Sequence, residues 1–184
     1  MMKDGVFMKK ISLLLALCIM LTFSLTACSE KYVSTEAGDY AEYLGKVVGA
    51  DEYMPKLVDM GQYTSFEATY KHSVTALMFE LDTVGLFLTY EDKDEFQLAV
   101  DNLTYDHLFY EEYPDEEKTD YLAEAGGYSI RMVKEEYELE VYKSSLLIGI
   151  DEEKQKICYL FYYDFGMDIL EDLDSYVSEH FYLS

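Results

Sequence analysis

Histidine and cysteine are the side chains most often used for catalysis and metal binding near neutral pH, and this chain of 184 residues has three of each. The histidines are His72, His107 and His180, and none belongs to a His-Glu-x-x-His zinc motif. The sequence also has no Cys-x-x-Cys pair, no Gly-rich phosphate loop and no Gly-x-Ser-x-Gly elbow. The sequence therefore predicts no catalytic residue and no cofactor, and we expect each histidine to serve packing or the surface.

Two clusters of acidic residues are candidate calcium sites, because calcium is bound by oxygen atoms. They span residues 91–95 and 171–174. Neither has the Asp-x-Asp-x-Asp-Gly order of an EF-hand loop, so we expect solvated charged faces there and leave metal binding open. Paired carboxylates can also cleave glycosides. A chain with 37 acidic residues offers many such pairs by chance, so this pattern selects none of them.

Cys28 is the most informative of the cysteines because of what precedes it. Lysines at positions 9–10 are followed by an apolar run over residues 11–25 and then by small residues that end in Ala27. A basic start, a short apolar core and a small-residue cleavage site are typical of an export signal rather than a spanning helix. Met8 fits as the start, since the residues before it add nothing that a signal needs.

Leu25-Thr26-Ala27-Cys28 resembles the lipobox of bacterial lipoprotein precursors, in which an aliphatic residue and two small ones precede a cysteine. The resemblance covers residues 8–28. It implies transfer of a diacylglyceryl group to the Cys28 thiol, cleavage between Ala27 and Cys28, and a lipidated new N-terminus. Stable membrane attachment takes about two acyl chains. The resemblance therefore implies a domain anchored to the extracytoplasmic face of the cell membrane.

The other two cysteines lead to different predictions. Cys18 lies inside the apolar run and follows Leu17, which is too large to stand next to a cleavage site, so Cys18 should not be modified. Cys158 lies in an apolar, strand-like run over residues 157–161 and is expected to be a buried structural residue. A single remaining cysteine cannot form an internal disulfide, which excludes a disulfide framework.

The chain is strongly acidic, with 37 acidic and 14 basic residues and a net charge of −23. Removal of residues 1–27 would leave 157 residues and a net charge of −25, a length that suits one domain. Such a charge argues against nucleic acid and anionic lipid headgroups as ligands of the protein. Half of the residues are hydrophobic, including 19 Tyr and 10 Phe, which favours a folded domain over disorder.

Hydrophobic periodicity predicts alternating helical and strand sections. Helices are expected over residues 39–48 with Asp39 as N-cap, within 50–60, over 92–107 with Asp92 as N-cap, at 121–125 and over 169–181. Strands are expected at 66–71, 75–81, 84–90, 128–133, 137–142, 146–150 and 156–163. Asp82-Thr83 is expected to form a hairpin turn, Gly85 a bulge or close contact, and Tyr162 should point away from Tyr159 and Tyr163.

This order of elements predicts an α+β fold, an antiparallel sheet of about five to seven strands with helices packed mainly on one face. The expected organisation is a signal peptide over residues 1–27, a lipidated tether over 28–38 and a single extracytoplasmic domain over 39–184. The mature part is similar to small, acidic, tyrosine-rich lipoproteins of Gram-positive bacteria that have no assigned activity. Residues 50–55 and the strands expected after them carry this resemblance. This resemblance implies no functional residues.

The leading functional hypothesis is a non-enzymatic binding or interaction domain that is attached to the membrane through the lipid on Cys28. Its acidic charge favours a basic protein or peptide as partner. The many tyrosines either form an exposed aromatic patch or fill the core and its rim. Two alternatives remain: an envelope protein that binds divalent cations, and a cell-envelope hydrolase whose active site assembles only in three dimensions.

Overall fold

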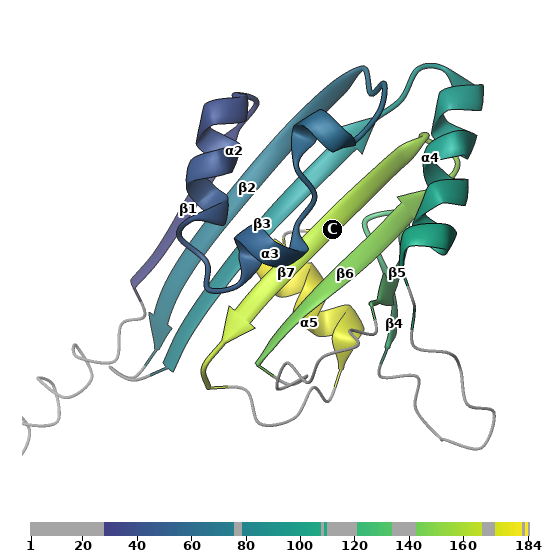
Figure 1. Cartoon of the computed structure of the whole chain (residues 1–184). Coiled ribbons are helices and arrows are strands. Elements are labelled where there is room, and N and C mark those ends of the chain that lie inside the picture. Colours follow the sequence, from purple (N-terminus) through teal and green to yellow (C-terminus); the bar gives the residue numbers. More distant parts are fainter. Residues whose placement is uncertain are drawn as a thin grey trace, which may run out of the picture.

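The computed structural model describes residues 28–75, 79–107, 109, 121–133, 143–166, 172–181 and 183. They form one antiparallel sheet of seven strands in the order β1-β2-β3-β7-β6-β5-β4 (Figure 1). The strands are β1 Cys28–Ser34, β2 Ser65–Thr75, β3 Phe79–Thr89, β4 Leu122–Ala125, β5 Tyr128–Met132, β6 Ser144–Asp151 and β7 Lys156–Asp164. The pairing of β3 with β7 joins a three-stranded half of the sheet to a four-stranded half.

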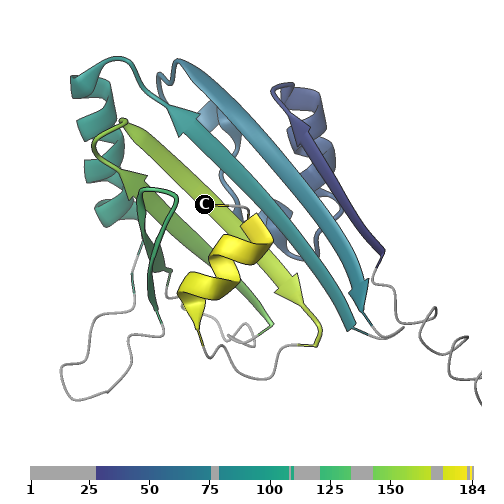
Figure 2. The same ribbon diagram turned by 180° about the vertical axis from the view of Figure 1, so that it is seen from behind.

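Helices cover both faces of the sheet, but mainly one of them. The described helices are α2 Ala37–Leu44, α3 Ala50–Tyr53, α4 Lys93–Asp106 and α5 Leu173–Phe181, together with a 3-10 turn, η1, at Leu57–Asp59. Helices α2, α3 and α4 lie on the face seen in Figure 1, here called the three-helix face. Helix α5 lies on the opposite face, here called the α5 face (Figure 2). The arrangement confirms the predicted α+β fold.

Alternation along the central strands separates two apolar cores. On β3, Val84 and Leu86 belong to the core of the three-helix face, whereas Phe87 packs against the core of the α5 face. On β7, Tyr159 belongs to the first core and Tyr162 to the second, which confirms the predicted divergence of these two tyrosines. Because both faces are covered at the centre of the sheet, six consecutive residues of β7 are buried.

The predicted hairpin turn at Asp82-Thr83 is wrong. Both residues lie within β3, where Asp82 pairs with His72 and Thr83 pairs with Lys71 of β2. They are buried, with 4% and 2% exposure. The Asp82 carboxylate can stay in the strand because it accepts hydrogen bonds from Tyr70 and His72. These partners are cross-strand neighbours, which the local sequence around Asp82 does not reveal.

The helical turn predicted for residues 121–125 is also wrong, because this segment forms β4 and pairs with β5. Gly126 and Gly127 connect the two strands with φ values of 60° and 89°. A two-residue turn with positive φ at both positions matches the twist of a β-hairpin. The two glycines, expected to stop a helix, therefore close a hairpin instead.

The segment predicted to be a tether, residues 28–38, contributes a strand in the structure. Cys28–Ser34 forms β1 and pairs with β2 over its whole length, beginning with Cys28 opposite Val74. An edge strand exposes unpaired backbone N–H and C=O groups, which can accept another strand whatever its side chains are. This backbone pairing explains how a polar segment joins the sheet without an apolar pattern of its own.

Helix α2 begins at Ala37, and its N-cap is Glu36, so the predicted Asp39 cap is wrong. Ser34 organises this start, because its Oγ accepts the Glu36 N–H at 3.0 Å and donates to Asp39 Oδ2 at 2.6 Å. Asp39 instead lies in the first turn, where a negative charge complements the helix dipole. The predicted apolar stripe is confirmed within α2 in Tyr40, Tyr43 and Leu44. The helix ends at Leu44, before the predicted residue 48; beyond it Val47 is buried, whereas Val48 is 65% exposed.

The predicted N-cap of α4 is confirmed. Asp92 Oδ1 accepts the backbone N–H groups of Asp94 and Glu95 at 2.8 and 3.1 Å. The predicted hairpin of β6 and β7 is confirmed as well. Other predictions fall outside the described residues: the signal peptide over 1–27, the strand at 137–142, and residues 169–171 before α5.

Gly85→Ala should lower the free energy of unfolding. A Cβ at this position would lie 2.7 Å from Thr69 Oγ1 and 3.0 Å from the Phe87 ring, which confirms the predicted close contact. Overpacking of this kind costs about 1–3 kcal/mol. Urea unfolding followed by circular dichroism measures the loss. Gly38→Ala in α2 is the control, because nothing lies within 4 Å of its Cβ position. Equal losses in both variants would contradict this account.

Candidate ligand-binding cleft

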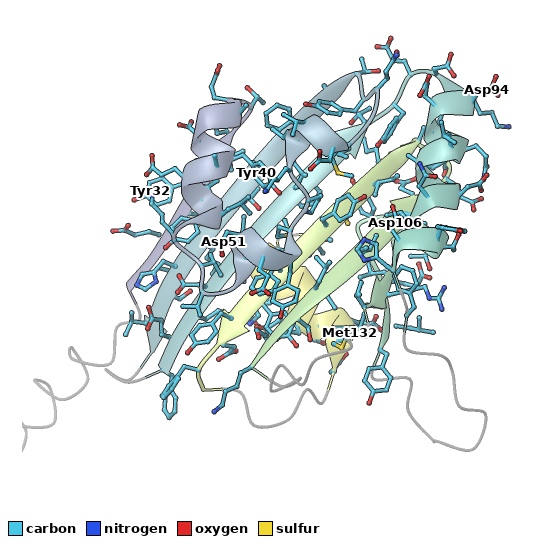
Figure 3. All side chains as sticks on the ribbon, viewed as in Figure 1. Tyr32, Tyr40, Asp51, Asp94, Asp106 and Met132 are labelled. Atoms are coloured by element: carbon cyan, nitrogen blue, oxygen red, sulfur yellow. The ribbon has the colours of Figure 1, made fainter. Side chains whose placement is uncertain are left out.

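A cleft with a volume of about 500 Å³ opens on the three-helix face, between residues 51–62 and helix α4. Asp51 comes from the α3 side and Asp106 from α4 (Figure 3). The floor contains Tyr90 and Tyr159. Ligand pockets for small molecules or peptide side chains usually measure roughly 300–1,000 Å³. The cleft is therefore large enough for a ligand of that size.

The wall formed by residues 51–62 is mostly irregular, but side chains from below hold it in place. The Tyr40 hydroxyl of α2 donates a hydrogen bond to the Pro55 carbonyl oxygen at 2.7 Å. The Tyr53 ring stacks on Phe161 of β7, with centroids 6.0 Å apart and an interplanar angle of 6°. These two contacts hold residues 51–62 against the rest of the three-helix face. The wall therefore does not depend on its short helical turns alone.

One face of α4 forms the opposite wall. Its lining residues recur at helical spacing: Glu95, Leu98, Ala99, Asn102, Leu103 and Asp106. The helix is held down by Phe96 and Leu103, which are buried against the sheet. The same amphipathic helix therefore docks on the core and presents two carboxylates, Glu95 and Asp106, to the cleft.

The floor presents two phenol groups. Tyr90 follows the end of β3, and Tyr159 lies within β7. Burial is the main cause that raises the pKa of Tyr90 to about 12, and nearby Glu95 adds to it. Burial also raises the pKa of Tyr159. Both phenols therefore stay neutral at physiological pH, and because each residue is only 3% exposed they close the base of the cleft without adding charge to it.

The cleft is strongly negative. Its lining contains five carboxylates and one lysine: Asp51, Glu52, Asp59, Glu95, Asp106 and Lys56. His107 also lines the cleft, and burial lowers its pKa, so its imidazole adds little positive charge at neutral pH. Clustered charges of one sign in a cleft attract ions of the opposite sign. The geometry therefore suits a cationic ligand.

The structure places the three histidines in three separate environments. His107 lines the cleft together with several carboxylates. The hydrolase alternative requires at least such a combination of a histidine and carboxylates in one pocket. His72 lies on the three-helix face, with Nδ1 2.8 Å from Asp82 Oδ1. His180 lies on the α5 face, with Nδ1 3.1 Å from Lys71 Nζ. No two of these three histidines belong to the same site.

Residues of the two acidic clusters that were candidate calcium sites bind backbone N–H groups in the structure. Asp92 caps α4, as described above. Asp172 accepts the Ser175 N–H at the start of α5, at 3.2 Å. Asp174 Oδ1 accepts the Glu124 N–H of β4 at 2.9 Å. These oxygens bind backbone groups, which gives them a structural role that requires no metal ion.

The two described cysteines, Cys158 and Cys28, lie in different parts of the fold. Cys158 is completely buried on the α5 face, and burial raises the pKa of its thiol. This confirms the expected buried, structural position and disfavours the nucleophilic thiolate. Cys28 is the first residue of β1, and Ala27 before it lies outside the described residues.

Comparison with known proteins gives no relative from which a function could be inferred, so the inference rests on the fold and the cleft. No protein-family model matches the chain, and neither the curated proteins nor the solved structures contain a match to it. Among the described residues, no helix has the length and apolar character needed to cross a membrane.

Tyr40→Phe should loosen the irregular wall of the cleft, because Pro55 would lose its hydrogen-bond donor. A net loss of about 1 kcal/mol in unfolding free energy is expected for one such bond. Amide hydrogen exchange should rise around residues 51–62, and urea unfolding gives the total loss. Tyr105→Phe is the control, because Tyr105 is 93% exposed. Unchanged exchange in the Tyr40 variant would show that the wall is held by other contacts.

Proposed function

We propose that this protein is a lipid-anchored extracytoplasmic binding protein whose acidic cleft receives a cationic ligand, such as a basic peptide or the basic side chains of a partner protein. The observation that carries the proposal is the cleft lining of five carboxylates and one lysine above two tyrosines. The lipobox resemblance of Leu25-Thr26-Ala27-Cys28 supports the anchor.

Charge favours this class of ligand both at long range and within the cleft. The net negative charge of the chain attracts cations at long range and raises their association rate. Tyr90 and Tyr159 are neutral but each is only 3% exposed, so they form the base of the cleft and the carboxylates of its walls supply most of the contact with a lysine or arginine side chain. Carboxylates on both walls, such as Asp51 and Asp106, can then pair with its charged group. The ligand is expected to lie between the walls.

If Cys28 carries the lipid, its position at the start of β1 determines how the anchored domain is oriented. Because Cys28 is itself the first residue of β1, a lipid on it would be joined to the sheet without a spacer. Cys28 pairs with Val74, and Val74 pairs with Glu80 near the start of β3. Tyr90 of the cleft floor comes ten residues later, about 33 Å along an extended strand. An anchored domain would therefore hold its cleft away from the membrane.

Loss of charge in the cleft should weaken binding of a basic peptide. Glu95→Gln with Asp106→Asn removes one carboxylate from the first turn and one from the last residue of α4, both of which line the cleft. At about 0.7 kcal/mol for each partly exposed ion pair, the dissociation constant of a lysine-rich peptide should rise roughly tenfold. Fluorescence anisotropy at low and moderate salt measures the change.

The matched control is Glu152→Gln with Glu153→Gln, because these exposed residues lie in the β6–β7 turn, outside the cleft lining, and the charge change is the same. This variant should keep most of the affinity. Equal losses in the two double variants would mean that the peptide responds only to overall charge. An unmodified protein that does not bind the peptide at low salt would reject a cationic ligand of this class.

The anchor is tested separately from the cleft. Cys28→Ala should abolish incorporation of radioactive palmitate into the full chain in bacterial cells, because the lipobox resemblance makes Cys28 the acylated residue. Cys18→Ala should leave incorporation intact, since the large Leu17 precedes it. Immunoprecipitation and autoradiography measure the label. Label that depends on Cys18 and not on Cys28 would refute the assignment.

A further inference from the structure

A second group of chemically active side chains lies on the three-helix face, near the end of the sheet that contains Cys28. His72 of β2 stands directly opposite Asp82 of β3, and Glu80 stands one pleat away on the same face. On the other side of His72, Glu30 of β1 is its direct partner. Acidic residues of both neighbouring strands therefore flank His72, but the Glu30 carboxylate accepts a hydrogen bond from Tyr32, which leaves Asp82 and Glu80 as the carboxylates grouped with the imidazole.

The distances within this group suit a metal ion. His72 Nδ1 lies 2.8 Å from Asp82 Oδ1 and 4.0 Å from Glu80 Oε1. One ligand atom from each of the three side chains can be chosen so that all lie within 4.8 Å of one another. Ligand atoms about 2.1 Å from a tetrahedral zinc ion are about 3.4 Å apart. The two distances bracket this value, and an ion between the side chains would replace the hydrogen bond between His72 Nδ1 and Asp82 Oδ1 once this nitrogen has lost its proton.

Burial gives the site a closed base and an open side. The Asp82 side chain is 5% exposed, whereas the side chains of His72 and Glu80 are 33% and 53% exposed. The Tyr70 hydroxyl, on the same face of neighbouring β2, donates to Asp82 Oδ1 at 3.2 Å and helps to orient the buried carboxylate. Outer hydrogen bonds of this kind orient metal ligands. An ion could enter from solvent and meet a pre-positioned carboxylate.

The charge balance also favours a divalent cation. Among the described residues, Asp82 and Glu80 both form an ion pair with the His72 imidazole, which offers at most one positive charge. The lysines of these strands, Lys31 and Lys71, pair with each other in the register on the opposite face, where Lys71 contacts His180 of α5. Burying a carboxylate is costly unless an opposite charge compensates it.

We propose that His72, Asp82 and Glu80 form a binding site for a first-row divalent metal ion, with zinc as the reference ion. The mixed set of one nitrogen and two carboxylate ligands suits zinc or manganese better than calcium, which prefers oxygen alone. The ion links β2 to β3 next to the edge strand β1. The site is separate from the acidic cleft and independent of its cationic ligand.

Metal binding is tested on the full chain, purified in detergent and stripped with chelator. Equilibrium dialysis should show one zinc ion retained per chain, and thermal unfolding should shift upward by about 5–10 °C at zinc concentrations near a hundred times the dissociation constant. Magnesium at the same concentration should give no comparable shift. Failure to retain zinc would overturn the proposal.

Three variants assign the site. His72→Gln and Glu80→Gln should each weaken zinc binding at least tenfold, and Glu67→Gln should leave it unchanged. Glu67 is an exposed residue of β2 on the opposite face and carries the same charge change. Circular dichroism checks folding, and the largely exposed Glu80 decides the result if the His72 variant unfolds. Zinc binding that survives in Glu80→Gln would place the ion elsewhere and overturn the proposal.

Discussion

The pairing of β3 with β7 is the constraint on which the rest of the structure depends. Nine residue pairs, from Leu81 opposite Asp164 to Thr89 opposite Lys156, join the two halves of the sheet. Because side chains alternate between faces, a slip of one residue would exchange the two cores. This register places Tyr159 on the three-helix face beneath the cleft and Tyr162 under α5. The covering helices then need only match the apolar surface that each face presents.

The same register places two candidate sites at opposite ends of one face. The cleft lies near the ends of β3 and β7 where Thr89 meets Lys156, and the group around His72 lies near the other end of β3. Their ligand preferences follow from their surroundings. Open walls with several carboxylates and aromatic rings suit an extended cationic group, whereas a buried carboxylate beside an imidazole suits a small ion.

The high acidic content of the chain has several structural roles that net charge does not reveal. Asp92 and Asp172 accept backbone N–H groups at the starts of α4 and α5. Asp151 Oδ1 accepts the Lys154 N–H in the β6–β7 turn, and Asp164 Oδ1 accepts the Gly166 N–H after β7. These carboxylates shape turns and helix starts. The carboxylates of the cleft differ because they are gathered by folding from separate segments.

Local chemistry alone was enough to predict the elements whose signals are contained in a few neighbouring residues. Asp92 before an apolar helical stripe, the alternation around Tyr162 and the hairpin of β6 and β7 are examples, and each is confirmed. The lipobox assignment is of the same local kind and stays a prediction. A cap, a period or a processing motif depends on adjacent residues, so it can be recognised without a partner from elsewhere in the chain.

Only the tertiary structure decided the features that depend on distant partners. Asp82 resembled a turn residue until the register placed it between Tyr70 and His72, and residues 28–34 resembled a tether until β2 supplied their backbone partners. The cleft likewise combines residues 51–62, α4 and β7. The sequence by itself determined the local elements and the acidic, tyrosine-rich composition of the chain. The tertiary structure decided where the charged and aromatic side chains come together, because hydrogen bonds and packing act between residues that are far apart in the chain.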